Sequence, residues 1–131
     1  MIGVDTNVLL RAITLDAPGQ SRVARRLLEQ LSDTEPGYII SIVLSELAWT
    51  LERPYNYKRR EVIAVISVLL GSSSFVIANR DEVRRVLSRA EEDTLDVSDA
   101  LLCELNLAAG CSTTATFDKR AARSYGFSLA K

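Results

Sequence analysis

A chain of 131 residues fits one domain with a single core, and hydrophobic and charged contents of 47% and 25% exclude a disordered protein. The formal net charge of −1 argues against a generally basic nucleic-acid-binding protein. Histidine is absent, which excludes Ser/His/Asp triads, imidazole-based ribonucleases and histidine zinc sites, so any catalysis must use carboxylates. We expect one domain over residues 1–131.

The first predicted elements are a short buried strand and a helix that follows it. The opening segment, MIGVDTNVLLR, is an apolar run that ends at Asp5 and continues into apolar residues at helical spacing. This pattern predicts a buried strand that delivers Asp5 to the start of a helix over about 7–13. Residues 16–19, with a proline and a glycine, end that helix.

The rest of the chain alternates between helical and strand patterns. In chain order we predict a helix at 21–31, a strand at 38–40, helices at 42–53 and 62–70, a strand at 75–77, helices at 81–91 and 96–109, a strand at 112–116, a short helix at 119–124 and an edge strand at 127–130. This alternation is typical of an α/β fold around a parallel sheet, in which active sites form outside the carboxyl ends of the strands.

The cysteines and the apolar runs carry little functional signal. Cys103 and Cys111 lack CxxC spacing and a nearby histidine, so we interpret both as core residues in a reducing compartment. No secretory signal is visible before Asp5, and the longest uncharged run, 62–79, is interrupted by Gly71 and three serines. We therefore expect a cytoplasmic protein without a membrane span.

Five acids lie in otherwise apolar or small-residue surroundings. They are Asp5, Glu46, Asp96, Asp99 and Asp118. Two carboxylates about 4 Å apart repel each other by roughly 4 kcal/mol at an effective dielectric constant near 20, so a cluster of them persists only around cations or by protonation. All-oxygen ligation selects Mg²⁺ or Mn²⁺, and such ions point to phosphoryl chemistry.

Most of these acids also have a purely structural interpretation. Asp5 can cap the first helix, Asp96 and Asp99 have the spacing of a capping box, and Asp118 can cap the last helix. Glu46 has no such role, because it lies inside a helix that is apolar nearly all round. We expect Glu46 to be buried and to need a compensating partner.

The order of the acidic motifs resembles a known family. DTN at Asp5, SEL with Glu46, DxxDALL with Asp96 and Asp99, and TFDKR with Asp118 together resemble the PIN-domain ribonucleases, in particular the VapC toxins of toxin–antitoxin pairs. The resemblance runs over essentially the whole chain. It implies a PIN-like three-layer sandwich, with a four- or five-stranded parallel sheet flanked by helices.

The resemblance also implies an activity, a cofactor and roles for individual residues. The implied activity is Mg²⁺-dependent endoribonuclease, with Mn²⁺ as a substitute. The implied site consists of the catalytic and metal-binding quartet Asp5, Glu46, Asp99 and Asp118, the additional acid Asp96, and the polar residues Thr6, Asn7 and Thr116, which orient the acids. The implied partners are an RNA substrate, a cognate antitoxin protein and a second copy of the chain in a homodimer.

Positive charge near the cleft would bind the RNA backbone. Lys119 and Arg120, next to Asp118, are the better candidates, and Arg11 is a further one. Two rival functions stay open. One is an aspartyl phosphotransfer protein of the phosphatase or receiver type, against which residue 7 is Asn rather than a second Asp. The other is a non-catalytic RNA-binding or scaffold domain on the same fold.

Overall fold

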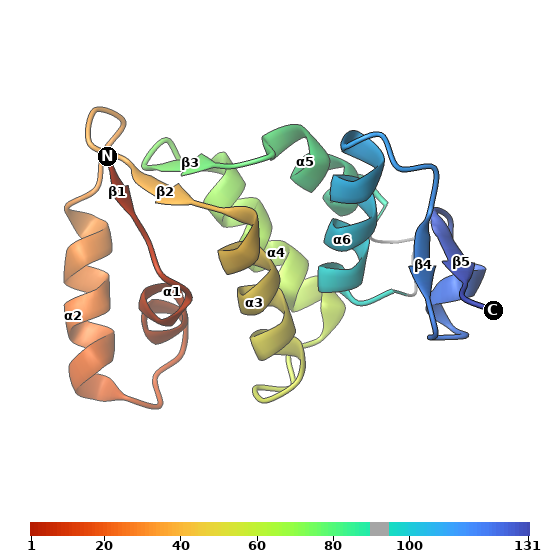
Figure 1. The fold of residues 1–131 in the computed structure, drawn as a ribbon. Coiled ribbons are helices and arrows are strands. Elements are labelled where there is room, and N and C mark those ends of the chain that lie inside the picture. The colour runs from red at the N-terminus through yellow and green to blue at the C-terminus, as the bar shows by residue number, and fades with distance from the viewer. Residues whose placement is uncertain (90–94) are drawn as a thin grey trace.

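The computed structural model of the chain describes residues 1–89 and 95–131 and has an α/β fold (Figure 1). Its helices are α1 (Thr6–Ile13), α2 (Pro18–Glu29), α3 (Ser41–Glu52), α4 (Arg59–Gly71), α5 (Arg80–Ser88), α6 (Val97–Ala108) and the 3₁₀ helix η1 (Ala121–Arg123). Its strands are β1 (Ile2–Gly3), β2 (Gly37–Ile39), β3 (Phe75–Ile77), β4 (Thr114–Thr116) and β5 (Phe127–Leu129).

These elements confirm the predicted order of helices and strands. The strand at 75–77 has the predicted bounds, and the short helix predicted at 119–124 is the 3₁₀ helix η1. Pro18 is the first residue of α2, where its missing N–H breaks no helical hydrogen bond. Gly110, with φ of 98°, lies just after the end of α6 and turns the chain out of the helix. The end of the helix predicted at 81–91 lies outside the described residues.

The strands of the described residues form two parallel sheets. In the first sheet β2 lies between β1 and β3, with Ile2 opposite Gly37 and Ile39 opposite Ile77. In the second sheet β4 pairs with β5, and Thr114 lies opposite Phe127. All pairings are parallel, as predicted. The expectation of one four- or five-stranded sheet is wrong, because the described strands form a three-stranded and a two-stranded sheet.

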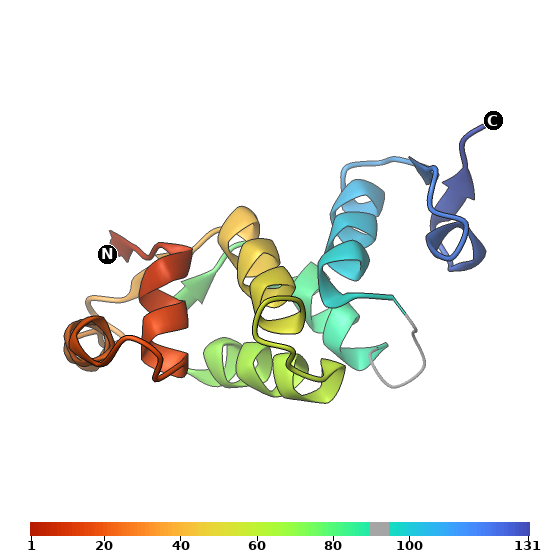
Figure 2. The same ribbon diagram turned by 90° about the horizontal axis from the view of Figure 1, so that it is seen from below.

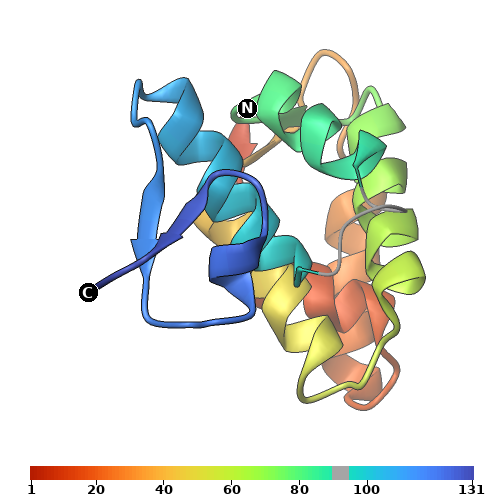
Figure 3. The ribbon, with the colours of Figure 1, turned by 90° about the vertical axis from the view of Figure 1, so that its right-hand side faces the viewer.

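Helices separate the two sheets. Figures 1 and 2 show β1, β2 and β3 toward one end of the molecule and β4 and β5 at the other, with α3 to α6 between them. Figure 3, which views the molecule from its C-terminal side, shows β4 and β5 in front of α6. Because β4 does not cover β1, both residues of β1 are exposed, and the prediction of a buried first strand is wrong.

The hydrophobic core lies between the first sheet and helices α1, α3, α4 and α6. Leu47 and Leu51 of α3 and Val62 of α4 have no exposed surface. Burying a side chain of this size contributes roughly 2 kcal/mol relative to leaving it in water, so this interface is the main source of stability. None of the helices within the described part of the chain is both long and apolar enough to cross a membrane.

We call residues 114–129, which comprise β4, η1 and β5, the C-terminal unit, and it is fastened to α6. The backbone of Gly126 packs so closely on α6 that a Cβ atom there would lie 2.2 Å from the Cys103 sulfur. The Cys103 thiol donates a hydrogen bond to the Tyr125 carbonyl at 3.4 Å, and the Asn106 amide donates to the Thr114 hydroxyl at 2.9 Å. These contacts hold the C-terminal unit against α6.

The cysteine predictions have different outcomes. Cys103 is fully buried, which confirms its prediction as a core residue. Cys111 is exposed, so its prediction is wrong, because it follows the turn at Gly110 that takes the chain out of the helix layer.

The close approach at Gly126 leads to a stability prediction. Gly126→Ala introduces a clash with Cys103 and a side chain at φ of 87°, whereas Gly110→Ala at φ of 98° meets no atom within 4 Å. We expect Gly110→Ala to lower the free energy of unfolding by about 1–2 kcal/mol and Gly126→Ala by about 2–5 kcal/mol. Urea unfolding of both variants measures the difference, and equal losses would contradict the described packing.

Candidate active site

Asp5 occupies the N-cap position of α1 directly after β1. Its backbone carbonyl accepts hydrogen bonds from the N–H groups of Val8 and Leu9, but its exposed carboxylate makes no capping hydrogen bond within the described residues. The adjacent Thr6 is buried, and its hydroxyl has no hydrogen-bond partner in residues 1–89 and 95–131. Asp5 thus has the position of a cap, while its carboxylate faces solvent.

Glu46 and Asp99 line the same cavity between α3 and α6. The cavity has a volume of about 490 Å³ and is lined by Ser45, Glu46, Trp49, Thr50, Ser98, Asp99 and Leu102. Residues 42, 46 and 49 follow one face of α3, and that face is turned toward solvent, with Ile42 66% and Trp49 52% exposed. Glu46 is exposed as well, so the prediction that it is buried is wrong.

Asp99 is half-buried and lies near other negative charges. Burial is the largest cause that raises its pKa above the ordinary value, and the carboxylates of Asp96 and Asp118 raise it further. Arg53 has the opposite, smaller effect. Asp96 and Asp118 are therefore close enough to Asp99 for their charges to repel its carboxylate.

Asp96 stands at the N-cap of α6 without capping it. Its carboxylate instead accepts a hydrogen bond from the Arg53 guanidinium at 2.5 Å, and the N–H of Val97 donates to Glu52 at 3.2 Å. The capping-box interpretation of Asp96 is thus wrong. Burial, and secondarily the Asp96 charge, raises the pKa of Glu52.

Glu52 and Arg53 were missed by sequence reasoning. Both belong to the end of α3, and they line a second cavity of about 290 Å³ together with Tyr57, Arg59, Asp96 and Arg120. Their only signal in the sequence is that they follow Glu46 by nearly two helical turns, which places them toward α6 once α3 and α6 pack together.

Asp118 follows β4 and caps η1. Its Oδ1 atom accepts hydrogen bonds from the N–H groups of Arg120 at 2.8 Å and Ala121 at 3.2 Å, which confirms the capping interpretation. The hydroxyl of Thr116 accepts the N–H of Asp118 at 3.0 Å, so Thr116 fixes the start of this turn. Capping uses one carboxylate oxygen and leaves the exposed carboxylate open to other ligands.

The structure brings four of the five predicted acids toward one place. Glu46 and Asp99 share a cavity, and Asp96 and Asp118 act on Asp99 through their charges. Asp5 neither lines this cavity nor contributes to the pKa shift of Asp99. Within residues 1–89 and 95–131, no three acids or cysteines are placed so that they could hold one metal ion.

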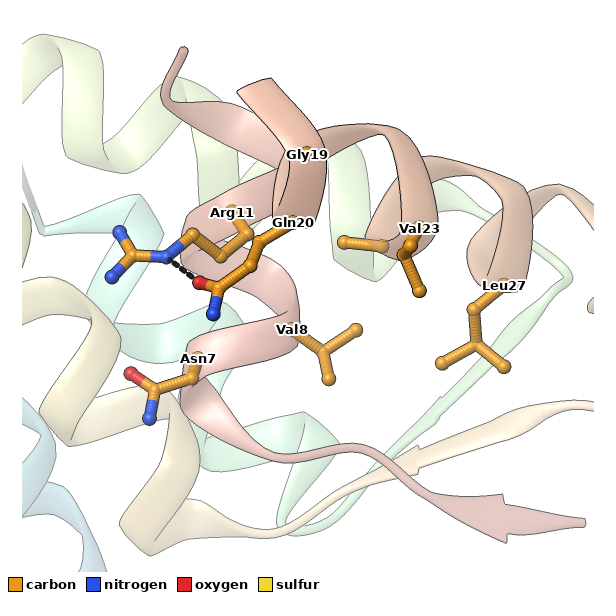
Figure 4. Close-up of a pocket in the computed structure, with 8 residues that line it drawn as sticks. Asn7, Val8, Arg11, Gly19, Gln20, Val23 and Leu27 are labelled. Carbon is orange, nitrogen blue, oxygen red and sulfur yellow. Dashed lines mark hydrogen bonds between the residues drawn. The ribbon is translucent and has the colours of Figure 1, made fainter. Parts of the chain in front are cut away.

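The predicted RNA-binding cations differ in their surroundings. Arg11 lines a cavity of about 640 Å³ between α1 and α2, which Figure 4 shows together with Asn7 and Val8. Its guanidinium donates hydrogen bonds to Gln20 at 2.8 Å and to Asp16 at 3.3 Å, so it is held within the fold. Lys119 and Arg120 are exposed beside Asp118.

Residues 2–126 match the sequence model of the PIN domain family. No curated protein matches the chain at a significant level. PIN domains are generally nucleases and are typically metal-dependent, with Mg²⁺ or Mn²⁺ as the usual ion.

The charge around Asp99 leads to a prediction about stability and pH. In the absence of divalent metal, Asp99→Asn should raise the melting temperature by about 2–4 °C at about pH 7, because it removes a half-buried charge among like charges. The raised pKa means that the folded wild type binds more protons than the unfolded chain just above pH 3.8, so wild-type stability falls as pH rises through this window. The advantage of the variant should therefore appear as pH rises and vanish below pH 3.8.

Thermal melts across this pH range measure the effect. Asp81→Asn is the matched control, since Asp81 lies in the first turn of α5, where a negative charge stabilises the helix. The control should melt no higher than the wild type, and a lower melting temperature of Asp99→Asn at neutral pH would contradict the repulsion.

Proposed function

The chain belongs to the PIN domain family, and from this premise we propose that it is a Mg²⁺-dependent endoribonuclease, the toxin of a toxin–antitoxin pair. The observation that carries the proposal is the cluster of carboxylates around the α3–α6 cavity, which Glu46 and Asp99 line and where Asp96 and Asp118 lie near Asp99. A fold maintained for packing alone would gain nothing from such repulsion.

The proposed catalytic and metal-binding residues are Asp5, Glu46, Asp99 and Asp118, with Asp96 as an additional acid. The chemistry of these donors fits Mg²⁺ or Mn²⁺, because all of them are carboxylate oxygens. Their placement in one copy fits less well, since its described residues assemble no group of three. The proposed cofactor is therefore supported by the chemistry of the donor atoms and by the usual use of Mg²⁺ or Mn²⁺ in PIN domain nucleases.

The surroundings of the cavity suit a nucleic acid chain. Trp49 is 52% exposed next to Glu46, and an exposed indole can stack on an unpaired base. Lys119 and Arg120, next to Asp118, offer positive charge to the phosphates. We propose that these residues orient an RNA strand across the cavity, while Arg11 has a structural role.

The proposal extends to partners and location. The motif order that resembles the VapC toxins supports a cognate antitoxin protein and a homodimer, and we place the activity on cellular RNA in the cytoplasm. Ile42, Trp49 and Leu102 are exposed apolar side chains beside the acids, and they suit a protein that covers the cavity.

A non-catalytic RNA-binding domain is the second candidate. Two observations favour it: Asp118 caps η1, and Asp96 is paired with Arg53, so both acids already have structural partners. Such a domain would retain RNA without cleaving it. The aspartyl phosphotransfer function has no comparable support.

The nuclease proposal is tested by cleavage of single-stranded RNA. We expect the wild type to cleave in Mg²⁺, to stop in excess chelator, and to lose at least about 100-fold in rate as Glu46→Gln or Asp99→Asn, because each loses a charge that a metal needs. Product analysis on gels measures this. Asp33→Asn, which changes an exposed loop acid, is the matched control and should keep full activity. RNA binding without cleavage by the wild type would favour the second candidate.

The toxin proposal predicts an effect on growth. Induced synthesis of the wild type should arrest bacterial growth, and Asp99→Asn, which removes the charge from the α3–α6 cavity, should not arrest it. Colony counts and RNA integrity after induction measure this, with equal protein levels checked by immunoblot. Normal growth at high levels of active nuclease would contradict the toxin role and leave the nuclease proposal standing.

A further inference from the structure

Within residues 1–89 and 95–131, one edge of strand β1 has no neighbouring strand. The N–H groups of Ile2 and Val4 donate to Pro36 at 3.1 Å and Tyr38 at 2.9 Å, so residues 2 and 4 direct their backbone groups toward β2. Because these groups alternate along a strand, the N–H and C=O of Gly3 point away from β2. Gly3 is exposed, and apart from its neighbours in the chain no described residue has an atom within 4 Å of the place where a Cβ would stand.

The strand β4 has a matching edge. Thr114 donates to Gly126 at 2.8 Å, and Thr116 accepts from Ala130 at 2.7 Å, so residues 114 and 116 face β5. The N–H and C=O of Ala115 therefore point away from β5. Ala115 is exposed, and the next residue but one, Phe117, is 85% exposed.

Edges of this kind are unusual in parallel sheets. Parallel strands are normally buried within larger sheets, and an open edge is a template for pairing with another strand. Both β1 and β4 expose apolar residues, with Met1 66% exposed beside β1. The outer edge of β3 differs, since Ile77 there is only 5% exposed.

The two open edges cannot meet within one copy as it is folded. They lie at opposite ends of the molecule, with α3 to α6 between them (Figures 1 and 2). The C-terminal unit is also held on α6 by the contact of Gly126 with Cys103. A strand that pairs with β1 must therefore come from another molecule.

We propose that two copies of this chain associate reciprocally, with β1 of each copy pairing in parallel with β4 of the other. A two-fold axis makes the two contacts equivalent and closes the assembly as a dimer. Each contact joins a three-stranded and a two-stranded sheet into one five-stranded parallel sheet, in the order β3, β2, β1, then β4 and β5 of the second copy.

This pairing completes the acidic site, a consequence that rests on the proposed function. Asp5 follows β1 and Asp118 follows β4, and parallel strands bring such residues to the same edge of a sheet. Of the registers that the alternation allows, Gly3 opposite Thr116 sets Asp5 of one copy opposite Asp118 of the second. Asp118 lies near Asp99 of its own chain, and Asp99 shares a cavity with Glu46, so each site would take Asp5 from one copy and the remaining acids from the other.

Proline substitutions at the strand edges test the association itself. Ala115→Pro removes the N–H that would bond to β1 of the second copy and leaves the β4–β5 hydrogen bonds in place. Leu129→Pro is the matched control, because Leu129 alternates with the bonded Ser128 and faces the outer edge of β5. Light scattering after gel filtration should give a dimer for the wild type and Leu129→Pro and a monomer for Ala115→Pro, with unchanged circular dichroism.

A wild type that stays monomeric at high concentration, or a dimer of Ala115→Pro, would overturn the proposal. This experiment needs no nuclease activity, so its result is separate from that of the proposed function. If Ala115→Pro does not fold, crosslinking decides in its place: Gly3→Cys with Thr116→Cys, in a Cys111→Ser background, should form disulfides between copies and not within one.

Mixed dimers test the shared site. Asp5→Asn and Asp99→Asn, each inactive alone, are co-expressed with different tags, and the mixed dimer is purified through both tags. One of its two sites then holds only wild-type acids, so it should cleave RNA at about half the wild-type rate per dimer. An inactive mixed dimer would place Asp5 and Asp99 of each site in the same chain and overturn the shared site. A wild-type protein that forms the dimer but does not cleave RNA would overturn the nuclease proposal and leave the proposed strand pairing standing.

Discussion

The packing of α3 against α6 is the contact on which the rest of the structure depends. Leu44, Leu47 and Leu51 of α3 and Leu101 of α6 are 0–2% exposed, so each helix holds the other in place. This contact has two results. It brings Glu46 and Asp99 to one cavity, and it puts a layer of helices between the two sheets.

Two acids of α6, Glu104 and Asp99, lie in opposite electrostatic surroundings. Glu104 is 6% exposed and is paired with Arg85 at 3.2 Å and with Arg89, so its charge is compensated as in an ordinary structural ion pair. Asp99, five residues earlier, instead lies near Asp96 and Asp118, and its pKa is raised. Negative charge is compensated at Glu104 and uncompensated at Asp99, and this contrast supports the proposed role of Asp99 in the active site.

The amino-acid sequence predicts the elements well, because each depends on neighbouring residues. Apolar spacing, together with Pro18 and Gly110, locates the helices, and the strand at 75–77 has the predicted bounds. The arrangement of the strands is less predictable. Alternation of helices and strands implies parallel pairing but does not say which strands are neighbours, so the separation of β4 from β1 is invisible in the sequence.

The sequence predicts which acids come near one another better than it predicts their surroundings. Clustering of Asp96, Asp99 and Asp118 follows from the expected fold, since all three lie at helix starts or strand ends. The exposure of Glu46 was missed, because the apolar residues beside it, Ile42 and Trp49, suggested a buried face. Periodicity distinguishes apolar from polar residues, but it cannot show that an apolar face lacks a cover within its own chain.

Because β1 and β4 are far apart within one chain, the number of complete sites in the reciprocal assembly would depend on the concentration of the protein. In the reciprocal assembly, the number of complete sites below the dissociation constant of the dimer grows with the square of the chain concentration. A few molecules per cell would then be almost inert, and doubling their number would raise the count of complete sites about fourfold. Synthesis rate would thus act as a nonlinear control, built into the spacing of two short strands.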